Sequence, residues 1–277
     1  MAPASVTERS LGMRDGCTIW TRLYPQRGQP RLLLIHSLGL DSSIWEHTAL
    51  HLAGDFEILL YDCRGHGRSE KRPGPYTLQL FADDAVCILE QYGWAKTYVA
   101  GCAMGGAIAQ SLADAAPSML IGLALIDTTA FYDLAGSEQW KIRAKRAKLE
   151  GFASLLPEQE KKWFTASFKE SNPHIANHLN HVFLRNDVEC YAAACNMLAT
   201  MDLRVSSSRI SIPTVIAVGQ ENVITPVAMA TQLQSIIRES RLEILDTGKH
   251  LAPVQSPKQI ATLIRSLLHI PAVDLGR

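Results

Sequence analysis

The segment from Tyr98 to Ala107, Y-V-A-G-C-A-M-G-G-A, is the most informative stretch of this 277-residue chain. Its apolar start predicts a strand, its glycines predict a tight turn, and the residues after the turn predict a helix. This is the pattern of a nucleophile elbow, G-x-S-x-G, whose middle residue lies in a strained turn between small neighbours. Gly101 and Gly105 are the small neighbours, so the reactive residue is expected at position 103. That position holds alanine, Ala103.

Short apolar runs alternate with helical patterns on both sides of this segment. The predicted strands are residues 17–23, 32–35, 58–61, 98–100, 123–126, 215–218 and 242–245. The predicted helices lie near residues 43–53, 78–91, 107–115, 227–237 and 257–268. Continuous apolar strands separated by helices indicate an α/β fold, with a mostly parallel sheet that helices flank on both faces.

One long segment interrupts the alternation. Between residues 128 and 204 only helical patterns occur, near 138–150, 157–168 and 188–201. The sequence therefore predicts a core of residues 1–127 and 205–277, and a helical lid (cap) of residues 128–204 inserted between two strands. An insertion at the carboxyl edge of the sheet would cover the place where α/β folds bind ligands. The alternative is an insertion that only widens the core or forms a dimer contact.

Composition and charge limit the classes of function. Lys and Arg number 27, as do Asp and Glu, so the formal net charge is zero. That balance argues against a protein built to bind nucleic acid or an anionic membrane. No apolar stretch reaches the 18 residues of a membrane span, and the start of the chain lacks the pattern of a signal peptide. We expect a cytoplasmic protein that acts on small molecules or on other proteins.

The cysteines and glycines do not predict a cofactor. The six cysteines contain no C-x-x-C pair and no histidine at zinc-finger spacing, so we expect reduced thiols and no metal. Residues 101–106 are glycine-rich but lack the spacing of a dinucleotide or phosphate-binding loop. The expected partner is therefore a small-molecule substrate without a cofactor; the oligomeric state is not predicted.

Several further motifs carry a family resemblance. They are L-I-H-S-L-G at 34–39, D-C-R-G-H-G-R-S at 62–69, the elbow, G-Q-E-N-V-I-T-P at 219–226, and G-K-H-L-A-P-V at 248–254. The chain resembles the α/β-hydrolases over residues 17–270, and within them the 3-oxoadipate enol-lactonases. The resemblance implies a small carboxylic ester or lactone as substrate, and acyl transfer to an elbow nucleophile.

The resemblance also implies the positions of the other catalytic groups. The family order is nucleophile, acid and histidine, which puts the base at His250 and the acid at position 222. Position 222 is Asn222, which can accept a hydrogen bond from an imidazole but carries no charge. Asp127, at the end of the strand 123–126, is an alternative acid or else a turn cap.

Backbone N–H groups of Leu38 and Met104 would form the oxyanion hole, which stabilises a negatively charged oxygen in the transition state. His36 and Ser37 are expected to shape that hole and contact substrate. Neither Ser37 nor Cys102 is expected to replace the missing nucleophile, because Ser37 lacks the elbow geometry. An elbow centred on Cys102 would put the bulky Met104 at a position that must be small.

Two features of the predicted lid suggest substrate contacts. Lys141, Arg143, Lys145, Arg146 and Lys148 form a basic run, which is either a solvated helix face or a surface that attracts an anionic substrate. Trp163 and Phe164 form either the core of the lid or the wall of a substrate pocket.

Three functional hypotheses remain for a chain with Ala103. The first is an ester or lactone hydrolase in a form that lost its nucleophile, for example by engineering. The second is a natural serine-less enzyme that uses His250 and the oxyanion hole for non-covalent chemistry, such as proton abstraction, decarboxylation, hydration or lyase-type reactions. The third is a non-catalytic small-molecule binding protein.

Overall fold

The computed structural model describes residues 5–246 and 248–269, so residues 1–4, 247 and 270–277 of the predicted core lie outside it. Over the described residues a single sheet has eight strands in the order β1-β2-β4-β3-β5-β6-β7-β8. The strands are β1 Thr7–Gly12, β2 Thr18–Tyr24, β3 Arg31–Ile35, β4 Glu57–Tyr61, β5 Thr97–Cys102, β6 Leu120–Ile126, β7 Thr214–Gly219 and β8 Ser240–Leu245. β1 and β2 pair antiparallel, β2 pairs antiparallel with β4, and the other neighbours are parallel. The predicted α/β fold with a mostly parallel sheet is confirmed.

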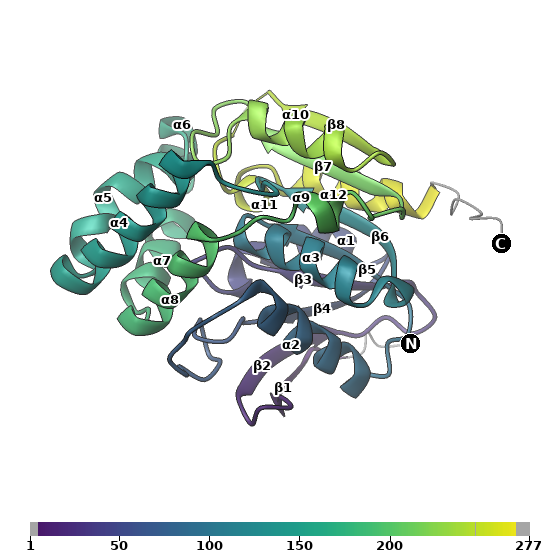
Figure 1. The fold of residues 1–277 in the computed structure, drawn as a ribbon. Coiled ribbons are helices and arrows are strands. Elements are labelled where there is room, and N and C mark those ends of the chain that lie inside the picture. The colour runs from purple at the N-terminus through teal and green to yellow at the C-terminus, as the bar shows by residue number, and fades with distance from the viewer. Residues whose placement is uncertain (1–4, 247, 270–277) are drawn as a thin grey trace.

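The helices of the sheet region are α1 Glu46–Leu52, α2 Leu78–Gln91, α3 Met104–Ala115, α9 Arg204–Ser207, α10 Val227–Ile236, α11 Ala252–Gln255 and α12 Pro257–Ser266. α2 and α3 pack together on one face of the sheet, and α1 packs against α12 on the other (Figure 1). The central strand β3 is covered on both sides, since Leu32, Leu33 and Leu34 have no exposed surface. This burial explains why β3 is a continuous apolar run rather than an alternating one.

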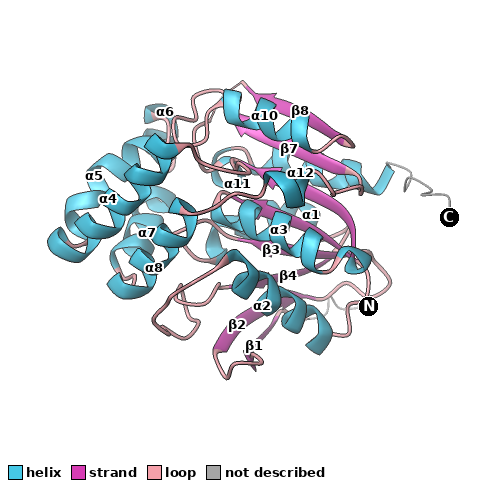
Figure 2. Ribbon diagram, viewed as in Figure 1, coloured by secondary structure: helices cyan, strands magenta, loops and turns pink. Residues whose placement is uncertain are grey.

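The segment between β6 and β7 is helical. It contains α4 Leu134–Glu150, α5 Phe152–Trp163, α6 Ala166–Ser171, α7 Pro173–Leu184 and α8 Val188–Ala199. Figure 2 shows α4, α5, α7 and α8 grouped beside one end of the sheet, away from the described end of the chain after α12. We call residues 128–204 the helical insertion.

Local signals set the helix ends in the insertion. Asp133 and Asp187 accept hydrogen bonds from the backbone N–H groups of Gly136 and Cys190, which caps the starts of α4 and α8. The helix predicted over residues 157–168 is interrupted, because Phe164 is extended and the Thr165 side chain caps a new helix, α6. Trp163 therefore ends α5 and Phe164 lies in the break before α6, with their rings packed edge to face at 6.1 Å between centroids.

The strand β1 and the helix α7 were not predicted, and neither were the one-turn helices α9 and α11. β1 is mostly exposed along its length, so its sequence T-E-R-S-L-G carries no apolar pattern, and only its pairing with β2 defines it. α7 is rich in His and Asn, which hide its apolar stripe of Ala176, Leu179 and Val182. No helix in the described residues is long and apolar enough to cross a membrane.

Candidate active site

The turn between β5 and α3 has the geometry of a nucleophile elbow. Ala103 adopts φ 52° and ψ −113°, a conformation that residues with a side chain rarely occupy. A Cβ atom on Gly101 would collide with the backbone of Gly105, and one on Gly105 would collide with the carbonyl of Ile35. The two glycines are therefore required by close backbone contacts, as the motif predicts. The strained residue between them carries a methyl group and no nucleophilic atom.

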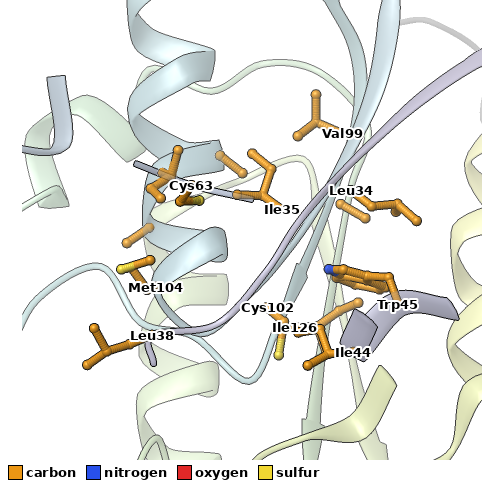
Figure 3. Packing of buried hydrophobic residues seen from close by; sticks show 14 of the residues in the cluster. Leu34, Ile35, Leu38, Ile44, Trp45, Cys63, Val99, Cys102, Met104 and Ile126 are labelled. Atoms are coloured by element: carbon orange, nitrogen blue, oxygen red, sulfur yellow. The ribbon is translucent and has the colours of Figure 1, made fainter. Parts of the chain in front are cut away.

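Buried apolar side chains pack tightly around the residues of the elbow. Leu38, Cys102 and Met104 lie among buried side chains of the neighbouring strands (Figure 3). Cys102 has no exposed surface, and its Sγ lies 4.0 Å from the backbone oxygen of His250. Burial raises the pKa of this thiol well above its usual range. Cys102 therefore packs beneath the turn as a neutral thiol and does not reach the cavity.

A cavity of about 270 Å³ opens above the elbow. Ala103, Met104, Leu38 and His250 line its floor together with Ser37. The helical insertion supplies most of the remaining wall. Those wall residues are Tyr132, Gly136, Gln139, Trp140, Ile142, Arg143, Arg146, Glu158, Gln159, Lys162, Trp163, Tyr191 and Leu198. The elbow, the histidine and the helical insertion thus share one cavity.

The two backbone amides of the expected oxyanion hole flank this floor. Leu38 follows β3 and Met104 begins α3, and both residues line the cavity beside Ala103. Among the hydrogen bonds of the described residues, neither amide donates to another protein group. Two free backbone donors next to the turn, one of them at a helix N-terminus, suit a developing negative charge on oxygen.

The candidate base, His250, is buried at the cavity floor and is held through one ring nitrogen. Its Nδ1 lies 3.2 Å from Oδ1 of Asn222 and 3.4 Å from Oγ1 of Thr225. Burial lowers the pKa of the imidazole to about 3, and the positive charge of Arg143 acts in the same direction. His250 is therefore neutral at pH 7.

Asp127 lies near the histidine but binds other groups. Its Oδ1 accepts hydrogen bonds from Nδ2 of Asn222 at 2.9 Å and from the N–H of Gly219 at 3.2 Å, and its Oδ2 accepts from the N–H of Ala252 at 2.8 Å. Burial raises the pKa of this carboxyl to about 6, although all three hydrogen bonds favour the charged form. Asn222, rather than Asp127, is the residue in contact with the imidazole.

His36 and Phe164, two expected substrate contacts, do not line the cavity. His36 is fully buried; its Nδ1 donates to the carbonyl of Ser37 and its Nε2 accepts from the N–H of Cys63, so it braces the loop after β3. Phe164 stacks on Phe168 inside the insertion, with ring centroids 5.2 Å apart. The other two expected contacts, Ser37 and Trp163, do line the cavity.

The basic run on α4 divides by ion pairing: three of its five members have glutamate partners, while Arg143 and Lys145 have none among the described residues. Lys141, Arg146 and Lys148 each form an ion pair with a glutamate of the insertion. Arg143 lines the cavity, as Arg146 does, but its Nε donates to the neutral hydroxyl of Tyr191 at 2.5 Å. Among the described residues no carboxylate lies within ion-pair distance of Arg143.

Arg143, Tyr191 and Thr225 are functional candidates that no sequence motif singled out. A signal for Arg143 was present, because Gln139, Arg143 and Arg146 have the spacing of one helix face, and all three line the cavity. Tyr191 and Thr225 carried no such signal, since their roles depend on contacts between distant segments. The described residues contain no cluster of His, Cys, Asp or Glu arranged to hold a metal ion.

Comparison with known proteins identifies the family. Residues 30–257 match the family described as the alpha/beta hydrolase fold. The chain belongs to the α/β-hydrolase family. It is 28% identical to 3-oxoadipate enol-lactonase 2 of Acinetobacter baylyi over 88% of this chain and 91% of that protein. It is 23% identical to the putative carbamate hydrolase RutD of Pseudomonas syringae pv. syringae, over 86% of this chain and 93% of that protein.

The enol-lactonase from Burkholderia xenovorans LB400 is a similar solved structure, with a TM-score of 0.90 and 28% identity. The match covers 95% of this chain and all of that one. Similar α/β-hydrolases therefore include proteins named as lactonases and as carbamate hydrolases, so the chain belongs to a hydrolase family.

Proposed function

We propose that this α/β-hydrolase cleaves a small, anionic carboxylic ester or lactone without forming a covalent acyl-enzyme, with water as the nucleophile and His250 as the general base. The observation that carries the proposal is the shared cavity, where Ala103, His250 and two unpaired backbone amides meet. The cavity thus offers a candidate base and two candidate oxyanion donors, but neither an elbow nucleophile nor a charged acid next to the histidine.

The reaction follows from these groups. Nε2 of His250 takes a proton from water as the water oxygen bonds to the carbonyl carbon. The carbonyl electron pair moves to its oxygen, and the N–H groups of Leu38 and Met104 stabilise the negative charge. The tetrahedral intermediate then collapses, the bond to the leaving oxygen breaks, and that oxygen takes the proton back from the imidazolium. The products are a carboxylic acid and an alcohol or enol.

Position 222 supports a serine-less enzyme rather than a triad that has lost one residue. Asn222 Nδ2 donates to Asp127 at 2.9 Å in a buried site. An aspartate at 222 would place a second carboxylate at that distance, where two like charges repel strongly. The pair Asn222 and Asp127 is therefore matched, and the departures at positions 103 and 222 belong together.

The substrate class rests on Arg143. It is the cationic group that faces the cavity without a carboxylate partner among the described residues. A guanidinium can hold a carboxylate through two parallel hydrogen bonds. The relatives named as 3-oxoadipate enol-lactonases act, by name, on a lactone of that kind, which supports an anionic ester or lactone here. The helical insertion acts as the lid that carries this arginine.

The deciding experiment uses two p-nitrophenyl esters of similar length, the neutral butyrate and the anionic monoester of glutaric acid. We expect the parent chain to hydrolyse the anionic ester steadily, without a burst of p-nitrophenol, and His250→Asn to abolish turnover. A stoichiometric burst in the parent would show a covalent intermediate and overturn the proposal. Binding without turnover would identify a binding protein. If only Ala103→Ser turns over, the chain is a hydrolase that lost its nucleophile.

A further inference from the structure

The orientation of the Asn222 side chain is fixed by its neighbours. Its Oδ1 accepts hydrogen bonds from the backbone N–H groups of Ile224 and Thr225, each at 3.0 Å. Its Nδ2 donates to Oδ1 of Asp127 and to Oγ1 of Thr225. Exchanging the oxygen and nitrogen would place NH₂ against two backbone donors and an amide oxygen against a carboxylate. Only one orientation satisfies all four partners.

This orientation determines which nitrogen of His250 carries the hydrogen. Two groups face Nδ1: the amide oxygen of Asn222 at 3.2 Å, which only accepts hydrogen bonds, and the hydroxyl of Thr225 at 3.4 Å, which can accept or donate. The nearer oxygen has no hydrogen to offer, and an unprotonated Nδ1 would place two lone pairs against each other. Nδ1 therefore holds the hydrogen and donates it, and Nε2 keeps the lone pair that a general base needs. When an asparagine replaces the aspartate of a protease triad, the wrong tautomer costs about 10⁴ in turnover; here the oxygen is turned toward the ring.

The carboxylate of Asp127 stands directly behind this amide. It is buried, and it links three segments: β7 through Gly219, the loop of Asn222, and the residue two places after His250, Ala252. A hydrogen bond from an amide to a carboxylate is stronger than one between neutral groups, and chains of such bonds polarise one another. The Asn222 oxygen consequently becomes a better acceptor for Nδ1–H of His250.

We propose that Asp127 is a positioning residue that acts on His250 through Asn222. The negative charge that triad enzymes place next to the imidazole is here one side chain further away, and the Asn222 amide transmits its effect. The inference rests on the proposed function in assigning His250 as the base, but its geometry can be tested without any substrate.

The test uses ¹⁵N-labelled histidine and NMR signals of the His250 ring, assigned with His250→Asn. In the parent chain Nδ1 should carry the hydrogen and Nε2 should have the shift of an unprotonated nitrogen. Asp127→Asn removes the charge and keeps the size; it should weaken the Nδ1–H hydrogen bond, moving that proton signal upfield, and lower kcat about tenfold with KM unchanged.

The exchange variant Asp127→Asn/Asn222→Asp is the matched control. It returns the charge to the residue that contacts His250, while position 127 is as altered as in the single variant. Recovery of the downfield Nδ1–H signal and of kcat supports transmission through position 222. If the single variant lowers only the melting temperature, or if the exchange variant restores neither the Nδ1–H signal nor kcat, Asp127 only stabilises the fold and the inference is wrong. Lack of catalysis in the parent would refute the proposed function and leave the NMR result decisive.

Discussion

Nε of Arg143 donates a 2.5 Å hydrogen bond to the hydroxyl of Tyr191, which joins α4 to α8 across the wall of the cavity. The guanidinium also lies 5.7 Å from the centre of the Tyr191 ring. These contacts hold the arginine in one place and leave its terminal nitrogens available to a ligand. Because Tyr191 is buried and carries no charge that would neutralise the arginine, the cavity has a fixed positive charge.

Replacing this arginine tests the substrate class. Arg143→Gln should raise KM for the anionic glutarate monoester about 10- to 100-fold, because a hydrogen bond to a charged group contributes about 1.5–3 kcal/mol. Steady-state kinetics with the neutral butyrate ester should change little. Lys141→Gln is the control, since Lys141 is paired with Glu138 and does not line the cavity. Equal losses for both esters would contradict a role for Arg143 in anion binding.

Ala103→Ser tests the chemistry at the elbow. A serine hydroxyl there would lie in the turn that presents nucleophiles in this family, next to a neutral His250. We expect a burst of about one equivalent of p-nitrophenol per enzyme in stopped-flow measurements, followed by slow turnover, because Asn222 lacks the charge that stabilises an imidazolium. Mass spectrometry should detect the acyl group on residue 103. No burst and no adduct would mean that the elbow is not aligned with His250.

Ala103→Gly tests the strain in the turn. Glycine adopts positive φ without a steric penalty, so the substitution should remove about 1–3 kcal/mol of strain and add back about 1 kcal/mol of unfolded-state entropy. We expect a net gain of about 1 kcal/mol in the free energy of unfolding, measured with urea. The same substitution at Ala115, exposed at the end of α3, should give no gain. A loss at position 103 would contradict the strained conformation.

Acid stability should depend on buried histidines. Burial lowers the pKa of both His250 and His66 to about 3. Below pH 6.5 the unfolded chain takes up protons on these rings while the folded chain does not. Each histidine therefore lowers the free energy of unfolding by up to about 1.4 kcal/mol for each pH unit of acidification. Asp127, whose pKa is raised to about 6, has the opposite effect and raises the free energy of unfolding on acidification. The reason is that below pH 6 the folded form binds a proton before the unfolded form does.

His250→Asn should therefore flatten the fall in unfolding free energy between pH 6.5 and 4 by up to about 1.4 kcal/mol per pH unit. Urea titrations at half-unit intervals would measure it. His47→Asn is the matched control, because His47 is exposed on α1. An unchanged slope in His250→Asn would show that His250 is not buried in its neutral form.

Local sequence patterns were enough to predict the parallel strands, the elbow and the position of the histidine. These features depend on local requirements: apolar runs for strands buried on both faces, and glycines where a Cβ atom would meet backbone. The same local patterns predicted the helical insertion, but not α7, whose polar residues hide its apolar stripe, nor β1, which exists through its pairing with β2.

Only the tertiary structure decided which groups meet at the site. Residues 127, 222 and 250 come from three separate loops, and their hydrogen bonds assign Asn222 to the imidazole and Asp127 to Asn222. The structure likewise placed Trp163, but not the adjoining Phe164, on the cavity wall. Of the five basic residues on α4, it singled out Arg143 as the one that lines the cavity without an ion-pair partner among the described residues. The physical reason is that orientation and burial arise when distant segments pack together. A sequence lists the charges of its side chains but does not state which of them will lose contact with water.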